Sequence, residues 1–353
     1  MQRPVFVMVA VTVALLCAIT GVTEEASLAE IIDMHVHVAG IGAGDSGIHI
    51  NEAMQESWRF PVYLRAFGVT REHLEAGGDT VLLEHLNAEI KASVRVSKAV
   101  VLAMDGVINE EGKLDRNATQ IYVPNEFLAR ELPRFEHLLF GASVNPYRHD
   151  ALERLEEVKS QGAVLIKWLP NIMYIDPADP ELRAFYETMV ELDLPLLTHA
   201  GRERAFANAR DELGDPARLA LPLEIGVRVI AAHVGTDGET DGEANFARIL
   251  PLFKAFPNLY ADISSLTQIN KLGHLRQVLA HPELENRLIY GSDWPLQFFP
   301  LVSPFYHLGD VPVSQASEIA RIDNQWDRDV ALKEAMGVPD AVFHRSAEAL
   351  NLR

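Results

Sequence analysis

The chain has 353 residues, of which 48% are hydrophobic and 23% are charged, a composition typical of a globular protein rather than a disordered or fibrous one. Its formal net charge of −19 would repel a phosphate backbone, so we expect no nucleic acid partner. The single cysteine, Cys17, excludes an intrachain disulfide and a cysteine-based metal site.

The first residues differ from the rest of the chain. An apolar run from Val5 to Ile19 follows Arg3, and small and acidic residues come after it, which is the pattern of an export signal. Extended to Val22, the run also fits a membrane anchor, whereas a mis-assigned start or a buried helix would explain it without export. We expect residues 1–23 to be a signal peptide or tether that leaves the domain at 28–353 outside the cytoplasm, periplasmic in a bacterium; a cytoplasmic location is the alternative.

After residue 27, short apolar runs alternate with stretches in which apolar residues recur at helical spacing, as in 152–158 and 246–253. The short runs are bounded by Gly, Pro, Asn or Asp, as expected for strands buried on both faces. Asp179-Pro180 and Asp215-Pro216 predict helix starts. The predicted strands are 31–36, 99–104, 138–144, 163–168, 194–199, 228–233, 259–263 and 288–293.

Eight buried strands separated by helices predict an α/β fold, a closed parallel (β/α)8 barrel. An open doubly wound sheet is the alternative, but it normally carries a Gly-rich phosphate loop after its first strand, where this chain has Asp33-Met34-His35-Val36-His37. A long insertion at 39–80 and a tail after Trp294, with helices near 324–336 and 341–350, exceed the minimal barrel. Because loops after strands gather at the catalytic face, the insertion and the loop after Trp294 are candidate lids.

Six side chains able to do chemistry come at the carboxyl ends of predicted strands, where barrel enzymes place their active sites. They are His35, His37, Lys167, His199, His233 and Asp293. Each alone has an ordinary explanation: a hydrogen-bonded core histidine, a turn-capping aspartate, or a lysine reaching solvent. Together, buried imidazoles and a carboxylate would be costly without a cation to bind them, so the sequence predicts a metal site.

Imidazole and carboxylate ligands suit Zn²⁺ best, with Mn²⁺, Fe²⁺ or Co²⁺ as alternatives. Three or four protein ligands leave a position for water, and bound Zn²⁺ lowers the pKa of that water towards about 7. Asp293 could accept the proton of the water, and His233 could polarise the substrate or act as acid and base.

Four strings of residues resemble the amidohydrolase-related family, part of the superfamily that includes aminocarboxymuconate-semialdehyde decarboxylase. They are Ile32-Asp33-Met34-His35-Val36-His37, Thr198-His199-Ala200-Gly201, Ala231-Ala232-His233-Val234-Gly235 and Leu288-Ile289-Tyr290-Gly291-Ser292-Asp293-Trp294-Pro295. The resemblance covers about residues 31–294 and implies the same barrel. The resemblance also implies roles for five residues. His233 would be the catalytic acid and base, and the metal ligands would be His35, His37, His199 and Asp293.

Lys167 leaves the number of metals open. In binuclear relatives a lysine ending the fourth strand is carbamylated and bridges two metals, and His199 and His233 would then serve the second ion. In one-metal relatives such a lysine can instead meet a substrate carboxylate. We favour one metal, because generating hydroxide does not require a second ion.

Substrate specificity is weakly encoded. Arg202 and Arg204 follow His199 and could clamp a carboxylate, although surface arginines are also common for solubility. The acidic run 237–243 lacks the ligand pattern of a calcium loop and predicts a solvated loop. Other candidates for the substrate pocket, which core packing would explain equally well, are Lys167, Trp168, Asn171, Trp294 and Phe298.

We expect a hydrolase in which a metal-bound hydroxide attacks an amide, ester or lactone of a small polar substrate such as a carboxylate. A metal-dependent decarboxylase of an unsaturated acid is the main alternative, and a non-catalytic metal-binding barrel is the third. The expected partner is therefore a small-molecule substrate. The sequence does not determine the oligomeric state, and a homo-oligomer is compatible with it.

Overall fold

The computed structural model of the protein describes residues 30–352. The predicted export segment, residues 1–23, and Cys17 lie outside this range. Within it, no helix is both long and apolar enough to cross a membrane.

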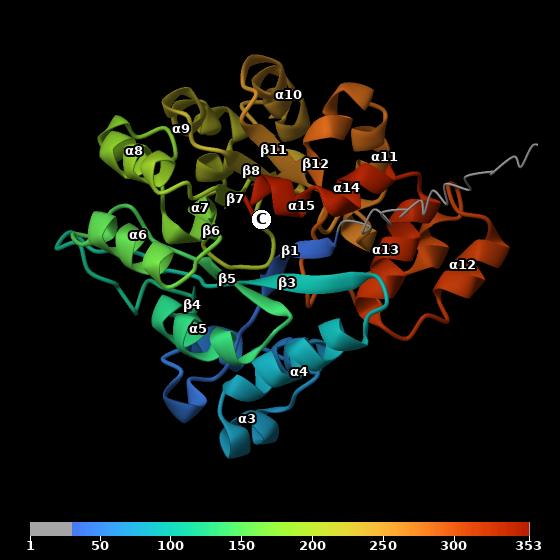
Figure 1. The fold of residues 1–353 in the computed structure, drawn as a ribbon, viewed down its shortest axis with the longest axis horizontal. Coiled ribbons are helices and arrows are strands. Elements are labelled where there is room, and N and C mark those ends of the chain that lie inside the picture. Colours follow the sequence, from blue (N-terminus) through green and yellow to red (C-terminus); the bar gives the residue numbers. More distant parts are fainter. Residues whose placement is uncertain (1–29, 353) are drawn as a thin grey trace, which may run out of the picture.

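A parallel eight-stranded sheet forms the centre of residues 30–352 (Figure 1). In spatial order its strands are β1 (Ile31–His37), β3 (Val96–Leu102), β5 (Leu138–Ala142), β6 (Leu165–Trp168), β7 (Leu196–His199), β8 (Val229–Ala232), β11 (Leu259–Asp262) and β12 (Leu288–Ile289). The segment after β12 returns to β1, where the N–H of Asp293 donates to the carbonyl of His35 at 2.9 Å and Trp294 bridges Val36 in parallel. The predicted (β/α)8 barrel is therefore confirmed.

All eight predicted strands are present, with ends displaced by up to a few residues. The largest difference is in the last strand, whose pairing with β11 ends at Ile289 rather than Asp293. The backbone N–H of Tyr290 donates instead to the carbonyl of Val342 at 3.1 Å, because a C-terminal helix covers this strand.

Side chains alternate along the strands, and one set fills the barrel interior: Ile32, Met34, Val100, Leu102, Leu165, Leu197, Ile230, Ala232 and Ile289. Two positions beyond Leu165 and Leu197, Lys167 and His199 continue the inward row. On β1 the register shifts between Asp33 and Val36, and Val36 packs on the outer core. Strict alternation would point neighbouring residues such as Met34 and His35 to opposite faces of the sheet. The register shift changes the direction of the side chains that follow it, so His35 and His37 point into the barrel although Met34 does so too.

Helices surround the sheet in Figure 1: α4 (Thr80–Ala92), α5 (Asn125–Glu131), α6 (Ala151–Ser160), α8 (Arg183–Glu191), α9 (Ala220–Ile225), α10 (Asn245–Ala255) and α11 (His274–Leu279). The helices predicted around 152–158 and 246–253 are thus confirmed as α6 and α10. In α6, Leu155 and Val158 are buried, but Leu152 is 40% exposed and does not belong to the buried face.

Both predicted Asp-Pro helix starts are confirmed. The side chain of Asp179 accepts the N–H of Glu181 at 2.9 Å, and that of Asp215 accepts the N–H of Ala217 at 3.0 Å. Each caps a 3₁₀ turn that leads directly into α8 or α9.

The two ends of the barrel are closed differently. The predicted C-terminal helices are α13 (Gln325–Ala335), α14 (Asp340–His344) and α15 (Ser346–Ala349), preceded by α12 (Val313–Ile319). In Figure 1, α14 and α15 lie in front of the barrel centre; there Ser346 donates to the carbonyl of Ile32 at 2.8 Å and Arg228 donates to that of Ala349 at 3.0 Å. Because these partners begin strands, α15 covers the amino-terminal end and leaves the other end open.

The 39–80 insertion contains short elements: β2 (His49–Ile50), α1 (Glu52–Gln55), α2 (Phe60–Ala66) and α3 (Arg71–Gly77). The remaining small elements are α7 (Pro170–Met173), β4 (Ile121–Tyr122), which pairs with β2, and the hairpin of β9 (Glu239–Thr240) and β10 (Glu243–Ala244).

Candidate metal centre

Three of the predicted metal ligands meet at the carboxyl-terminal end of the barrel. His35 Nε2 lies 3.1 Å from His37 Nε2, and Asp293 Oδ1 lies 3.3 Å from His37 Nε2 and 3.6 Å from His35 Nε2. A tetrahedral zinc ion with bonds of about 2.0–2.2 Å sets its ligand atoms about 3.3–3.6 Å apart. The three residues therefore form a cluster that could hold a metal ion.

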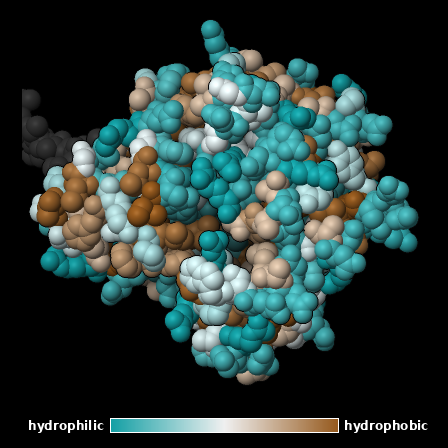
Figure 2. Space-filling model, turned by 180° about the vertical axis from the view of Figure 1, so that it is seen from behind, coloured by the Kyte–Doolittle hydropathy of each residue, from teal (hydrophilic) through white to brown (hydrophobic). Residues whose placement is uncertain are grey.

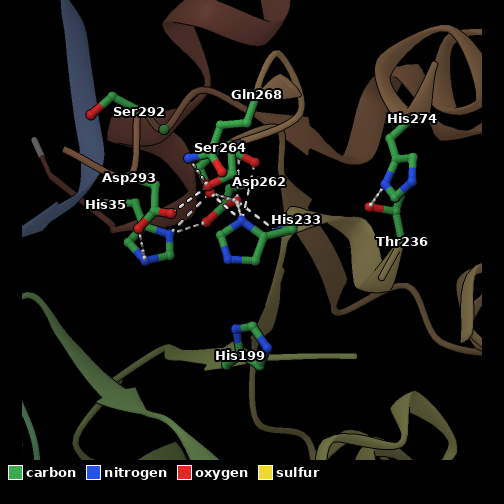
Figure 3. Close-up of polar contacts among 12 residues, drawn as sticks. His35, His199, His233, Thr236, Asp262, Ser264, Gln268, His274, Ser292 and Asp293 are labelled. Carbon is green, nitrogen blue, oxygen red and sulfur yellow. Dashed lines mark hydrogen bonds and ion pairs between the residues drawn. The ribbon is translucent and has the colours of Figure 1, made fainter. Parts of the chain in front are cut away.

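Asp262, at the end of β11, orients His35 and was missed in the sequence. Its Oδ2 accepts a hydrogen bond from His35 Nδ1 at 2.8 Å (Figure 3). Since a carboxylate only accepts, the ring proton of His35 is on Nδ1 and the lone pair of Nε2 faces the cluster. Burial alone would raise the pKa of Asp262, but the hydrogen bonds from His35 and Ser264 hold it below its ordinary value.

Asp293 is held in an uncommon backbone conformation, with φ of 64°. The hydroxyl of Ser265 donates to Asp293 Oδ2, so Oδ1 is the oxygen directed at the histidines. Although burial would raise the pKa of Asp293, the hydrogen bond to His37 keeps it well below its usual value. Asp293 is therefore an ionised carboxylate at neutral pH.

His233 lies just beyond β8, and its φ of 55° turns its ring towards the cluster (Figure 3). The ring stacks on His35 with centroids 5.4 Å apart. Its Nδ1 is 3.0 Å from the carbonyl oxygen of Ser264, which can only accept, so Nδ1 carries the proton and Nε2 is left as the accepting atom. Burial lowers the pKa of His233 well below its ordinary value, so the ring is neutral.

His199 lies across from the cluster, at the end of β7 (Figure 3). Its ring centroid is 5.3 Å from that of His233, and its Nε2 is buried without a hydrogen-bond partner in residues 30–352. An orphaned imidazole nitrogen of this kind is costly unless a cation or water meets it. His199 does not belong to the three-residue cluster, so its role as a fourth ligand stays a prediction. Burial lowers the pKa of both His37 and His199 to about 4, which keeps them neutral, as ligands must be.

Lys167 is fully enclosed at the end of β6, with Nζ 3.1 Å from His35 Nε2. Burial lowers the pKa of Lys167 to about 8, against the opposing effect of the Asp262 and Asp293 charges. The amine lies beside the cluster, where either role predicted for it remains open.

A cavity of about 710 Å³ leads from the cluster to the surface. Its polar end carries the cluster, His199 and His233, and its other walls are largely apolar. Both candidate lids contribute to these walls, the insertion through Met54, Trp58, Phe60, Tyr63 and Phe67, and the loop after Trp294 through Phe298 and Leu301. Figure 2, seen from the side opposite to Figure 1, shows hydrophobic surface beside a hollow near the middle of this face.

Three residues predicted for the pocket do not line the cavity. Trp168 follows the inward-pointing Lys167 on its strand and therefore points outward, where its Nε1 donates to the carbonyl of Val144 at 2.7 Å. Asn171 is buried and donates to the carbonyl of Gly201 at 3.1 Å. Trp294 is buried and stacks on Trp326 with centroids 5.5 Å apart. All three serve core packing.

Arg202 and Arg204 do line the cavity, but both guanidinium groups already have partners. Arg204 binds Asp237 through two bonds of 2.8 and 2.7 Å, and Arg202 Nε lies 3.3 Å from Asp211. Asp237 is buried, so the first residue of the acidic run is not solvated as predicted, whereas Asp241 and Glu243 are exposed.

Lys271 and Glu203 also line the cavity and were missed. Both follow strands in loops with no recognisable pattern. Asp262 had a usable signal, since it is the last residue but one of the predicted strand 259–263, close to the level of the other site residues.

Comparison with known proteins places the chain among relatives of the same architecture. A family model described as "Amidohydrolase" matches residues 32–312. An uncharacterised TIM-barrel protein from Bordetella bronchiseptica is 16% identical with a TM-score of 0.53, covering 86% of this chain and 99% of that one. No curated protein matches.

Two further solved structures share the fold. The apo IDCase of Metarhizium anisopliae is 12% identical with a TM-score of 0.51, covering 92% of this chain and 97% of that one. A protein from Staphylococcus aureus described as a putative amidohydrolase is 12% identical with a TM-score of 0.50, covering 92% of this chain and 100% of that one.

Proposed function

Since this chain belongs to the amidohydrolase family, we propose that it is a zinc-dependent hydrolase that cleaves an amide, ester or lactone bond of a small molecule. The observation that carries the proposal is the convergence of His35, His37 and Asp293 at the closed end of a cavity large enough for such a substrate. Pockets for small molecules generally combine apolar walls with a few polar groups of this kind.

The donor set fits a metal ion on three grounds. The three ligand atoms have near-tetrahedral spacing, His37 is neutral, and the carboxylate is ionised. His199 would supply a fourth nitrogen, its Nε2. A bound zinc ion supplies Lewis acidity and, by lowering the pKa of water, a nucleophile at neutral pH.

The protein's own groups are arranged to handle protons. Asp293 presents an ionised Oδ1 while Ser265 holds Oδ2, so Asp293 is positioned to accept a proton from the attacking water. His233 presents Nε2 as an acceptor while Ser264 holds its Nδ1, so it can take a proton and return it to the leaving group. We assign these two residues as the catalytic base and acid.

We propose one metal rather than two. The compact cluster involves three residues, and a second ion would require Lys167 to be carbamylated and His199 and His233 to serve that ion as ligands. Metal analysis of the purified protein tests this: a ratio near two that falls when Lys167→Ala is introduced would overturn it.

Activity is tested by screening esters, lactones and amides with the metal-loaded protein in water enriched in oxygen-18. Incorporation of the label into the acid product supports hydrolysis. Release of carbon dioxide from an unsaturated carboxylic acid added to the screen, with no label in the remaining organic product, would replace it with decarboxylation. His35→Ala and Asp293→Asn should each abolish both metal binding and turnover, while exposed His73→Gln should change neither. Undiminished turnover in metal-free protein would end the proposal.

The run Val5–Ile19 supports a further proposal, that the enzyme acts outside the cytoplasm. Cell fractionation of the full chain and of a variant starting at residue 28 tests it; the same compartment for both would refute it.

A further inference from the structure

Lys271 is a buried lysine whose amine has no partner among residues 30–352. It ends a 3₁₀ turn (Ile269–Lys271) in the loop after β11, is 6% exposed, and lines the cavity. Within residues 30–352, no carboxylate lies within the 4.0 Å of an ion pair from its amine, and the amine makes no hydrogen bond. Burying an unpaired ammonium is costly.

The protein's other fully buried lysines show the usual solution. Lys333 donates to Asp329 at 2.7 Å and to the carbonyl of Gly291 at 3.0 Å. Lys167 has His35 Nε2 at 3.1 Å. Lys271 is therefore an exception that core packing does not explain.

The carboxylates nearest in the cavity are already engaged. Asp237 is bound by both nitrogens of Arg204, and Asp293 faces His37 and accepts from Ser265. Glu203 accepts the N–H of Ala205 at 2.6 Å. None of them neutralises Lys271 at hydrogen-bonding distance.

The arginines of the same cavity differ from Lys271 in both exposure and pairing. The side chains of Arg202 and Arg204 are 58% and 51% exposed, and each is tied to an aspartate. The third arginine of the cavity, Arg59, is exposed and lies over the ring of Trp58. A ligand anion would have to displace those aspartates, whereas at Lys271 it would meet an unpaired donor in a less solvated place, where a charge-assisted hydrogen bond is stronger.

We propose that Lys271 binds an anionic group, a carboxylate, of the substrate. The apolar walls of the cavity include Trp58, Phe60, Phe67 and Phe298, so the proposed substrate joins an apolar or aromatic body to an acid group. This assignment rests on the proposed function, because it names the substrate class of the same site.

Isothermal titration calorimetry of the full-length protein, kept free of metal so that the amide is not hydrolysed during the titration, with phenylacetate and with its neutral analogue phenylacetamide tests the assignment. Lys271→Met removes the charge and keeps much of the side-chain volume. It should weaken phenylacetate binding by about 10- to 100-fold, as expected for losing a hydrogen bond to a charged group, and leave phenylacetamide binding within about twofold. Lys254→Met, at an exposed position of α10, should leave both unchanged.

Lys271→Arg keeps the charge and should retain phenylacetate binding within about 10-fold, which separates lost charge from lost folding. The assignment is overturned if the unmodified protein does not bind phenylacetate, if Lys271→Met binds it as before, or if both ligands weaken equally. Because binding is measured without turnover, its failure leaves hydrolysis standing, and a protein without hydrolytic activity still reports on Lys271.

Discussion

Asp262→Asn is the sharpest test of how the candidate site is organised. Asp262 is completely buried and touches the cluster only through His35. One oxygen accepts the backbone N–H groups of His233 at 2.9 Å and Ser264 at 3.1 Å, and an asparagine carbonyl can replace it. The other accepts His35 Nδ1 at 2.8 Å, where asparagine would present an N–H₂ group.

Two donors cannot hydrogen-bond to each other, so the His35 proton must move from Nδ1 to Nε2 or the contact must break. In the cluster, His35 Nε2 lies 3.1 Å from His37 Nε2 and is the atom that would bind the metal. Once Nε2 is protonated, it has no lone pair left for a metal ion. Losing the partner that orients a ligating histidine costs about 10- to 100-fold in metal affinity, or about 1.4–2.7 kcal/mol. The lost charge-assisted hydrogen bond also lowers folding stability by about 1.5–3 kcal/mol.

Competition between the protein and a chelating dye for zinc measures the affinity, and urea unfolding of metal-free protein measures the stability. Asp105→Asn is the matched control, because Asp105 is also buried and bound by backbone N–H groups and Arg148 but contacts none of the histidines. The control should lose stability and keep its zinc affinity. If Asp262→Asn also bound zinc within about twofold of the unmodified protein, the orienting role would be refuted.

Three other changes test the surroundings of the cluster. As pH falls from 6.5 to about 4, unfolded His199 takes up a proton that the folded protein excludes, so the contribution of His199 to stability drops by about 1.4 kcal/mol per pH unit and levels off on either side. His37 adds a similar slope. Urea unfolding of metal-free protein should show this slope reduced in His199→Gln but not in the exposed control His73→Gln; equal slopes would contradict it. Gly291→Ala would place Cβ 3.0 Å from that of His35, which should displace the ring and lower zinc affinity by about 10-fold in the dye competition, and an unchanged affinity would count against that tight fit. Trp58 is 76% exposed at the cavity wall, so Trp58→Ala should weaken phenylacetamide binding by about 1 kcal/mol in calorimetry while unfolding free energy shifts by less than about 0.5 kcal/mol; a large loss of stability would show that Trp58 is a core residue instead.

The sequence predicted those features of the structure that depend on a local pattern of residues. Buried strands show as short apolar runs, and side-chain alternation along them is regular, so the barrel and the inward positions of Lys167 and His199 followed. The same alternation contradicts the pocket role given to Trp168, the next residue after an inward lysine. Asp262 could have been found in the same way, near the end of a predicted strand.

The remaining features depended on contacts between distant segments. Asp237 became buried because Arg204 reaches it across 33 residues, and Lys271 became an unpaired cation because its loop lies against the cavity. His199 stands apart from the His35–His37–Asp293 cluster by an arrangement that no spacing in the chain specifies.

The sequence alone was sufficient to predict the barrel and the strand ends at which the candidate site residues lie, because hydrophobic periodicity and backbone direction are local properties. Tertiary structure decided which of those side chains are within ligand distance and which charges are already neutralised. Those properties depend on distances of a few ångströms between loops, and loop paths follow from packing rather than from any repeating pattern.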